Sequence, residues 1–87
     1  MYTPAFDEKW PTYFERLDKR TREKVAKKIK RIVSFPQKKH LKGKARFFVG
    51  EVGQYRIIYR VFEENKTVVF YFVGNHKDYT KWYSQLF

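Results

Sequence analysis

GQYRIIYRVF, residues 53–62, is the stretch that decides the fold, because β-branched and aromatic residues follow a Gly-Gln turn and favour a β-strand. Neighbouring side chains of a strand leave opposite faces of the sheet. One face of this strand therefore carries Tyr55, Ile57, Tyr59 and Val61, which can pack on a core. The other face carries Arg56, Ile58, Arg60 and Phe62. Its two guanidinium groups have the planar, forked shape that binds phosphate.

The rest of the chain surrounds this strand with two amphipathic helices and two further strands. Apolar residues at helical spacing predict a first helix that begins near a cap at Asp7, and a second helix that ends at Phe35-Pro36. Strands are predicted at residues 45–52, 54–62 and 67–73, with a short edge strand at 1–5 and a short helix within 75–87. The fold class is therefore α+β, with a two-helix hairpin packed on one face of a small antiparallel β-sheet and a short C-terminal helix or tail.

The size and charge of the chain limit its class. With 87 residues, it is expected to form a single domain, residues 1–87. No cysteine is present, so disulfides and thiolate-bound zinc are excluded. The 20 Lys and Arg against 9 Asp and Glu give a charge of +11, which predicts a polyanionic partner: nucleic acid first, then an anionic membrane surface or an acidic protein. The apolar runs are too short to cross a bilayer, so we expect a soluble, cytoplasmic protein that needs no membrane.

The second helix carries most of this charge. Eight cations lie between residues 19 and 31, and Glu23 is the only acid among them. A charged face is also what an ordinary solvated helix shows, so a binding surface and a solvated face have about equal weight.

The strand order predicts a second cationic group near an imidazole. If residues 67–73 pair antiparallel with the GQYRIIYRVF strand, His76 comes close to Arg56, and we expect Lys44, Arg46 and Glu51 at the same end of the sheet. A titratable imidazole with fixed cations can cleave RNA without a metal, because it moves a proton while the cations stabilise the charged phosphate. The isolated histidines offer no metal-ligand spacing, so no metal or other cofactor is expected.

The motif pattern resembles the RelE/ParE toxin superfamily over nearly the whole chain. The resemblance is carried by LKG at residues 41–43, VGQYRIIYRV at 52–61 and VGNHKDY at 73–79, the last being similar to the endings of the HigB and YafQ branches. It implies the toxin of a type II toxin–antitoxin pair, an endoribonuclease that cuts mRNA on the ribosome and is neutralised by a cognate antitoxin protein. It implies catalytic roles for Arg56, His76 and Tyr79, and we expect contact with RNA at Lys42, Lys44, Arg46, Arg60 and Lys77.

Two points and two other functions stay open. Val49 and Glu51 stand where ribonuclease members are often basic, and Glu51 is either a general base or, as we favour, an ion-pair partner of Arg56. The chain could instead be a ParE-like inhibitor of DNA gyrase, or a basic module that binds nucleic acid without cutting it. Aromatic side chains such as Phe47, Phe48 and Trp82 could stack on bases in that module, although Trp82, Tyr83 and Phe87 have the helical spacing of packing residues.

Overall fold

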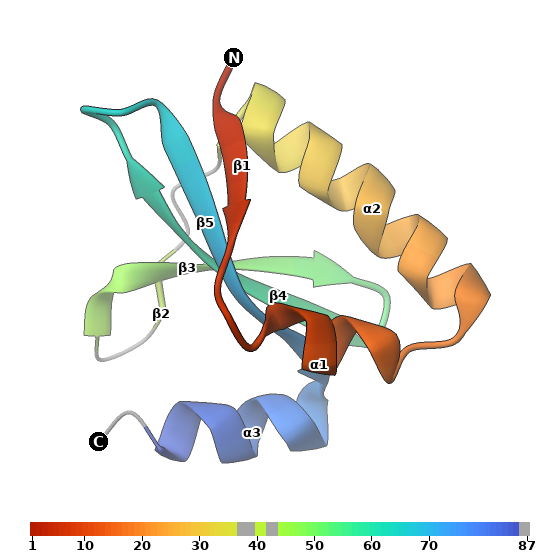
Figure 1. The fold of residues 1–87 in the computed structure, drawn as a ribbon. Helices are drawn as coiled ribbons and strands as arrows, with labels where there is room; N and C mark the ends of the chain where they lie inside the picture. Colours follow the sequence, from red (N-terminus) through yellow and green to blue (C-terminus); the bar gives the residue numbers. More distant parts are fainter. Residues whose placement is uncertain (37–39, 42–43, 86–87) are drawn as a thin grey trace.

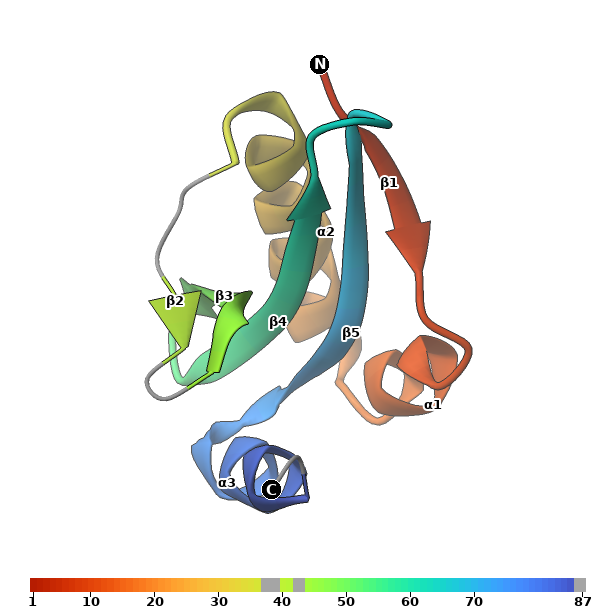
Figure 2. The same cartoon turned by 90° about the vertical axis from the view of Figure 1, so that its left-hand side faces the viewer.

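The computed structural model describes residues 1–36, 40–41 and 44–85. In these residues five strands form one sheet, in the order β1-β5-β4-β3-β2, and three helices cover it (Figures 1 and 2). The elements in chain order are β1 Thr3–Phe6, α1 Trp10–Glu15, α2 Lys19–Ser34, β2 His40–Leu41, β3 Lys44–Val52, β4 Tyr55–Phe62, β5 Thr67–Asn75 and α3 His76–Ser84. The predicted α+β class, with a helical hairpin against one sheet face, is confirmed.

The sheet is mixed rather than wholly antiparallel. β3, β4 and β5 pair antiparallel through short turns, as predicted. The expected edge strand is β1, but it pairs parallel with β5, from Thr3 opposite Thr67 to Phe6 opposite Phe70. Parallel strands are joined by a long connection, so the residues of β1 alone do not indicate which strand it pairs with or in which direction.

The helical hairpin begins later than the sequence predicts. Phe6 belongs to β1, and α1 starts at Trp10 with Lys9 as its N-cap, rather than after a cap at Asp7. Asp7 is not the cap of this helix, because its carboxylate accepts a hydrogen bond from the Lys9 backbone N–H at 3.0 Å in the preceding turn. Pairing with β5 holds Phe6 extended and so delays the helix.

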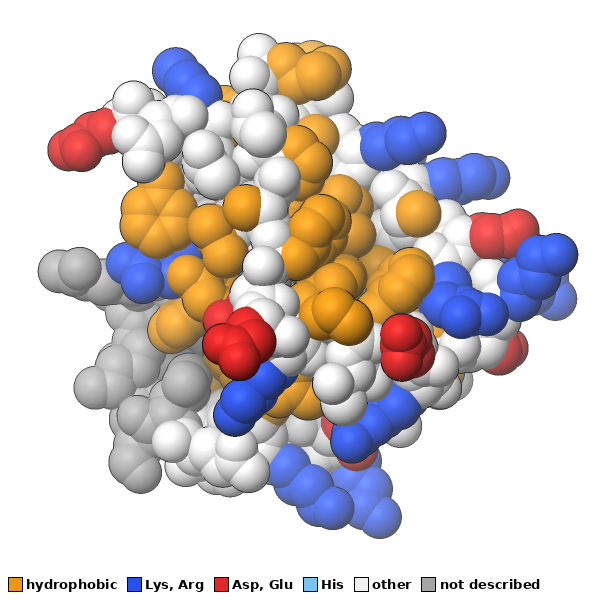
Figure 3. Space-filling view, in the orientation of Figure 1, with side chains coloured by type: hydrophobic (Ala, Val, Ile, Leu, Met, Phe, Trp, Pro, Cys, Tyr) orange, Lys and Arg blue, Asp and Glu red, His pale blue; other side chains and the backbone are white. Residues whose placement is uncertain are grey.

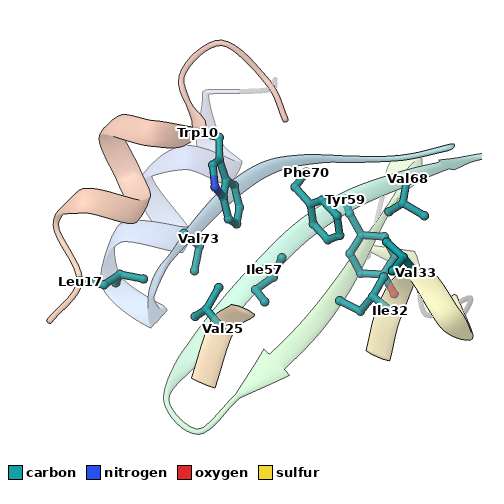
Figure 4. Packing of buried hydrophobic residues seen from close by; sticks show 10 residues of the cluster. All are labelled: Trp10, Leu17, Val25, Ile32, Val33, Ile57, Tyr59, Val68, Phe70 and Val73. Atoms are coloured by element: carbon teal, nitrogen blue, oxygen red, sulfur yellow. The ribbon is translucent and has the colours of Figure 1, made fainter. Parts of the chain in front are cut away.

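The main core lies between the helical hairpin and the sheet (Figure 4). Its buried members are Trp10, Leu17, Val25, Ile32, Val33, Ile57, Tyr59, Val68, Phe70 and Val73. We call this set the main core. Ala26 of α2 is exposed and does not belong to this core.

A β-bulge in β5 divides the aromatic residues between the two sheet faces. Ile58 pairs with Phe72 and the next residue, Tyr59, pairs with Phe70, so Tyr71 has no opposite residue on β4. The extra residue changes the phase of the alternation. Phe70 therefore joins the main core, whereas Phe72 faces the opposite side with Ile58.

That opposite side is covered by α3. Trp82 stacks on Phe72 with ring centroids 5.5 Å apart and meets Phe47 edge-on at 5.6 Å. We call Ile58, Phe72 and the rings packed on them the α3 core. Packing by Trp82 and Tyr83 is thus confirmed, and Phe87 lies outside the described residues. No helix in the described part of the chain has the length and apolar character needed to cross a membrane.

Candidate active site

Antiparallel pairing brings three strands together at one end of the sheet. Arg56 lies opposite Glu51 on β3 and opposite Gly74 on β5. The chain then continues from β5 directly into α3, whose first residue is His76. Arg56 and His76 therefore belong to the same end of the sheet, as the strand order predicted.

The two residues line one open hollow of about 430 Å³. Its walls are Glu51, Gly53, Gln54, Arg56, Asn75, His76 and Lys77. We call it the first hollow. It combines an imidazole, a guanidinium and an ammonium group, so an anion that enters it meets positive charge from β4 and from α3.

The start of α3 is fixed by a side-chain cap. The Asn75 side-chain oxygen accepts a hydrogen bond from the Asp78 backbone N–H at 2.9 Å. The Thr80 hydroxyl donates to the His76 carbonyl oxygen at 2.9 Å, which closes the first turn. His76 and Lys77 are both exposed and sit in that first turn, where the helix dipole also favours an anion.

Gly74 lets α3 fold back against the sheet. A Cβ atom at this position would lie 2.7 Å from Cζ of Phe72 and 3.2 Å from Cβ of Asp78. The first distance is shorter than real carbon contacts allow. Any larger residue at 74 would therefore displace the aromatic ring or the first turn of α3, and with it His76.

Tyr79 holds Arg56 in place from the next turn of α3. The guanidinium carbon lies 5.0 Å from the centre of the Tyr79 ring, and the guanidinium donates a hydrogen bond to the phenol oxygen. Burial raises the pKa of Tyr79 above its ordinary value of 10.0, although the charge and hydrogen bond of Arg56 act in the opposite direction. The phenol therefore keeps its proton at neutral pH. The His76 ring centroid lies 6.2 Å from that of Tyr79, so one tyrosine neighbours both groups.

The remaining predicted cations lie elsewhere. Arg60 is four residues beyond Arg56 on β4, and its guanidinium carbon lies 4.9 Å from the Phe62 ring centre and 5.7 Å from that of Phe47. Lys44 and Arg46 belong to β3, but they precede Glu51 by seven and five residues, about 17–24 Å along an extended strand. The prediction that they frame the same end as Arg56 is therefore wrong. Lys42 lies outside the described residues.

Two polar residues of the first hollow were missed in the sequence. Asn75 could have been found, because Asn followed three residues later by Asp is a helix-start signal. Gln54 offers no such signal, since its place in the hollow depends on how the turn between β3 and β4 is positioned. Within residues 1–36, 40–41 and 44–85, no three His, Asp or Glu side chains gather closely enough to hold a metal ion.

Comparisons with known proteins find similarity to toxins of toxin–antitoxin systems. The family model described as the ParE toxin of the type II toxin–antitoxin system matches residues 1–79. No curated protein matches the chain.

Solved structures give close matches over most of the chain. A chain in the intact E. coli RelBE toxin–antitoxin complex is 25% identical, with 86% of this chain and 96% of that chain covered and a TM-score of 0.77. The isolated E. coli RelE toxin is 22% identical, with both chains covered completely and a TM-score of 0.76, which is a likeness of fold. A chain in the RelBE2 toxin–antitoxin complex of Mycobacterium tuberculosis is 25% identical, covers 86% and 98%, and has a TM-score of 0.71.

Proposed function

From the premise that this chain belongs to the ParE toxin family, within the RelE/ParE superfamily of type II toxins, we propose that it is a metal-independent endoribonuclease that cleaves mRNA on the ribosome. The observation that carries the proposal is the shared hollow of Arg56, His76 and Lys77. Three groups with different chemistry meet there at an open surface large enough for a nucleotide. Residues 1–87 act together as one toxin domain in this proposal.

The reaction needs no group beyond those of the chain and the RNA. The 2′-oxygen attacks the adjacent phosphorus, the bond from phosphorus to the 5′-oxygen breaks, and a 2′,3′-cyclic phosphate and a 5′-hydroxyl result. One proton leaves the 2′-oxygen and one reaches the 5′-oxygen, so a single titratable group can serve either transfer. His76 supplies the imidazole of the first hollow, and an imidazole can both accept and donate a proton.

Arg56 supplies the charge that the reaction requires. Negative charge grows on the phosphate oxygens as the fifth bond to phosphorus forms, and a guanidinium held in advance stabilises that charge without having to reorganise. Tyr79 keeps the guanidinium in position through ring stacking and the hydrogen bond. Lys77 adds a second cation in the first turn of α3.

A translating extract tests the proposal. We expect the full chain to stop protein synthesis and to leave defined mRNA ends, and we expect Arg56→Ala and His76→Ala to leave mRNA intact. If both variants block synthesis as strongly as the parent, these residues are not the active site. RNA that is bound but never cut by the parent would favour the non-catalytic module instead.

A gyrase inhibitor is the second candidate, because the matching family model is that of ParE toxins. Gyrase inhibition and RNA cleavage are told apart by which nucleic acid is broken. Trapped DNA breaks in the presence of gyrase, with mRNA intact, would favour this function over RNA cleavage.

The proposed protein partner is a cognate antitoxin. Two solved relatives at 25% identity are RelBE toxin–antitoxin complexes. The net charge of +11 favours an acidic partner, and exposed rings such as Phe35, with 78% of its surface accessible, favour one with apolar side chains. Figure 3 shows apolar side chains across the face that carries β1, with Lys and Arg along the outer side of α2. Since its substrate and antitoxin are intracellular, we also infer a cytoplasmic location.

A further inference from the structure

A second hollow lies between α2 and the C-terminal end of β3. Its volume is about 230 Å³, and it is lined by Lys24, Lys27, Lys28, Arg31, Glu51 and Val52. We call it the second hollow. Four cations face one carboxylate there, so about three positive charges lack a partner within its walls.

The four cations share one side of α2 because of their spacing. They are three, one and three residues apart, which places them along one stripe with about 5.4 Å between turns. The buried residues Val25 and Ile32 occupy the neighbouring stripe and face the sheet. A row of cations with this spacing matches a ligand with repeated negative charges better than a single small anion.

Gly50 brings this row close to β3. A Cβ at position 50 would lie 3.2 Å from Cδ1 of Ile32 and 3.5 Å from Cε of Lys28. The absence of a side chain at Gly50 therefore lets the stem of Lys28 lie over the strand. The position of the cations is thus a product of the packing between α2 and β3.

Glu51 connects the two hollows. It lines the first hollow together with Arg56 and His76, and it also lines the second with the α2 cations. Glu51 therefore forms part of the wall of both hollows, near the C-terminal end of β3. A strand bound in one of them can continue into the other by passing this residue.

We propose that the second hollow binds the phosphate backbone of the same RNA strand that is cut in the first hollow. The inference rests on the proposed function, because it is the continuity with an RNA-cleaving site that favours RNA over an acidic peptide. The contacts are made to phosphates and not to bases, so this site strengthens binding without selecting a sequence. The Glu51 carboxylate repels the RNA phosphates that lie beside it. Cleavage then takes place in the first hollow, and the second hollow only binds the backbone.

The test measures binding of the full chain to single-stranded RNA that is 2′-O-methylated to prevent cleavage. Two lengths are used, about twelve nucleotides, which can span both hollows, and about three, which can fill only one. For Lys27→Gln/Lys28→Gln we expect the longer RNA to bind about tenfold more weakly at low salt. The slope of log affinity against log salt should fall by about 1.4, since each lost phosphate contact to a single strand contributes about 0.7. The short RNA should bind as it does to the parent.

A matched control separates a site from general charge. Lys19→Gln/Lys30→Gln removes the same two charges from exposed positions of α2 outside both hollows. We expect this pair to change affinity for the longer RNA by less than about twofold. Equal losses for the two pairs would overturn the proposal, and so would equal losses for the two RNA lengths.

Two other outcomes overturn it for distinct reasons. If the Lys27 and Lys28 variant weakens binding to polyglutamate but not to RNA, the hollow serves an acidic protein. If RNA is cut in the translating extract while the variant binds RNA normally, the second site is wrong and the proposed function stands. A parent protein that binds no RNA of either length overturns the second site, whereas the proposed function is overturned only if mRNA stays intact in the translating extract.

Discussion

The two faces of the sheet differ in how many buried side chains cover them. On the helical hairpin side, the main core contains ten buried residues from α1, α2, β4, β5 and the segment between the helices. On the other side, the α3 core has two buried residues among those described, Ile58 and Phe72, and every side chain of α3 keeps part of its surface exposed. The catalytic groups proposed here all belong to that second, thinner side. The scaffold and the site are therefore stabilised separately, because sites that must admit a ligand come from the less stable parts of a fold.

Two adjacent isoleucines test whether the two faces of the sheet differ in packing. Ile57 and Ile58 are both fully buried but face the main core and the α3 core respectively. We expect Ile57→Ala to lower the free energy of unfolding by about 4 kcal/mol and Ile58→Ala by about 2 kcal/mol. Partly exposed rings beside Ile58 can move into the space, whereas the main core is enclosed. Urea unfolding measures both values, and equal losses would show that the faces do not differ in packing.

The second comparison concerns activity rather than stability. Arg56→Ala should lower mRNA cleavage about 10²- to 10³-fold, because it removes a donor aimed at the transition-state charge. Its free energy of unfolding should change by no more than about 0.5–1 kcal/mol, since the side chain is only partly buried. Arg20→Ala, which removes an exposed cation from α2, is the matched control and should cleave normally. A similar loss of cleavage in both variants would show that net charge, rather than the position of Arg56, causes the effect.

The helix caps on the two sides offer a third, smaller test. Asp18 caps α2 and Asn75 caps α3, each accepting a backbone hydrogen bond at 2.9 Å. Asn75→Ala should cost about 1 kcal/mol of stability and also reduce cleavage, because His76 and Lys77 lie in the turn that it fixes. Asp18→Ala should destabilise the protein without a specific loss of cleavage. Cleavage per folded molecule is the deciding measurement, and unchanged cleavage in the Asn75 variant would contradict the positioning role.

The Asp18 cap also has its own pH dependence. Hydrogen bonds from Thr21 hold the pKa of Asp18 below its ordinary value of 3.8. Its contribution to stability is therefore present above about pH 3.8 and is lost as the pH falls through the lowered pKa. The Asn75 side chain has no ionisable group, so this cap should not share that acid sensitivity.

The smallest expected effect lies at high pH. Burial raises the pKa of Tyr59 in the main core and that of Tyr79 beside α3 above 10.0. Unfolded tyrosines ionise near pH 10 while the folded protein keeps these protons, so stability is full below about pH 10 and falls as the pH rises through the raised values. Tyr59→Phe should reduce this alkaline loss more than Tyr79→Phe, because Arg56 partly offsets the raised pKa of Tyr79. Unfolding curves between about pH 8 and 11 test the order, and the reverse order would contradict it.

The candidate site was predictable where it depends on local pattern and simple pairing. Arg56 falls on the outer face of its strand by alternation, and the antiparallel return of β5 brings His76 to the same end. The ring contacts of Arg60 were not predictable in this way, whereas the position of Arg46 was, because the same antiparallel pairing puts the start of β3 far from Glu51. Arg60 shares the face of Arg56 but lies along aromatic rings, and the direction of β3 carries Arg46 toward the far end of the sheet.

By itself, the sequence determined the helices, the three long strands and the meeting of Arg56 with His76, because these follow from periodicity and from short connections that leave few alternatives. Tertiary contacts set the parallel pairing of β1, the bulge that sends Phe70 and Phe72 to opposite faces, and the place of Glu51 in the walls of both hollows. Those features arise when distant segments bury one another. These features are stabilised by the burial of apolar surface between segments that are distant in the sequence. No local stretch of residues therefore predicts them.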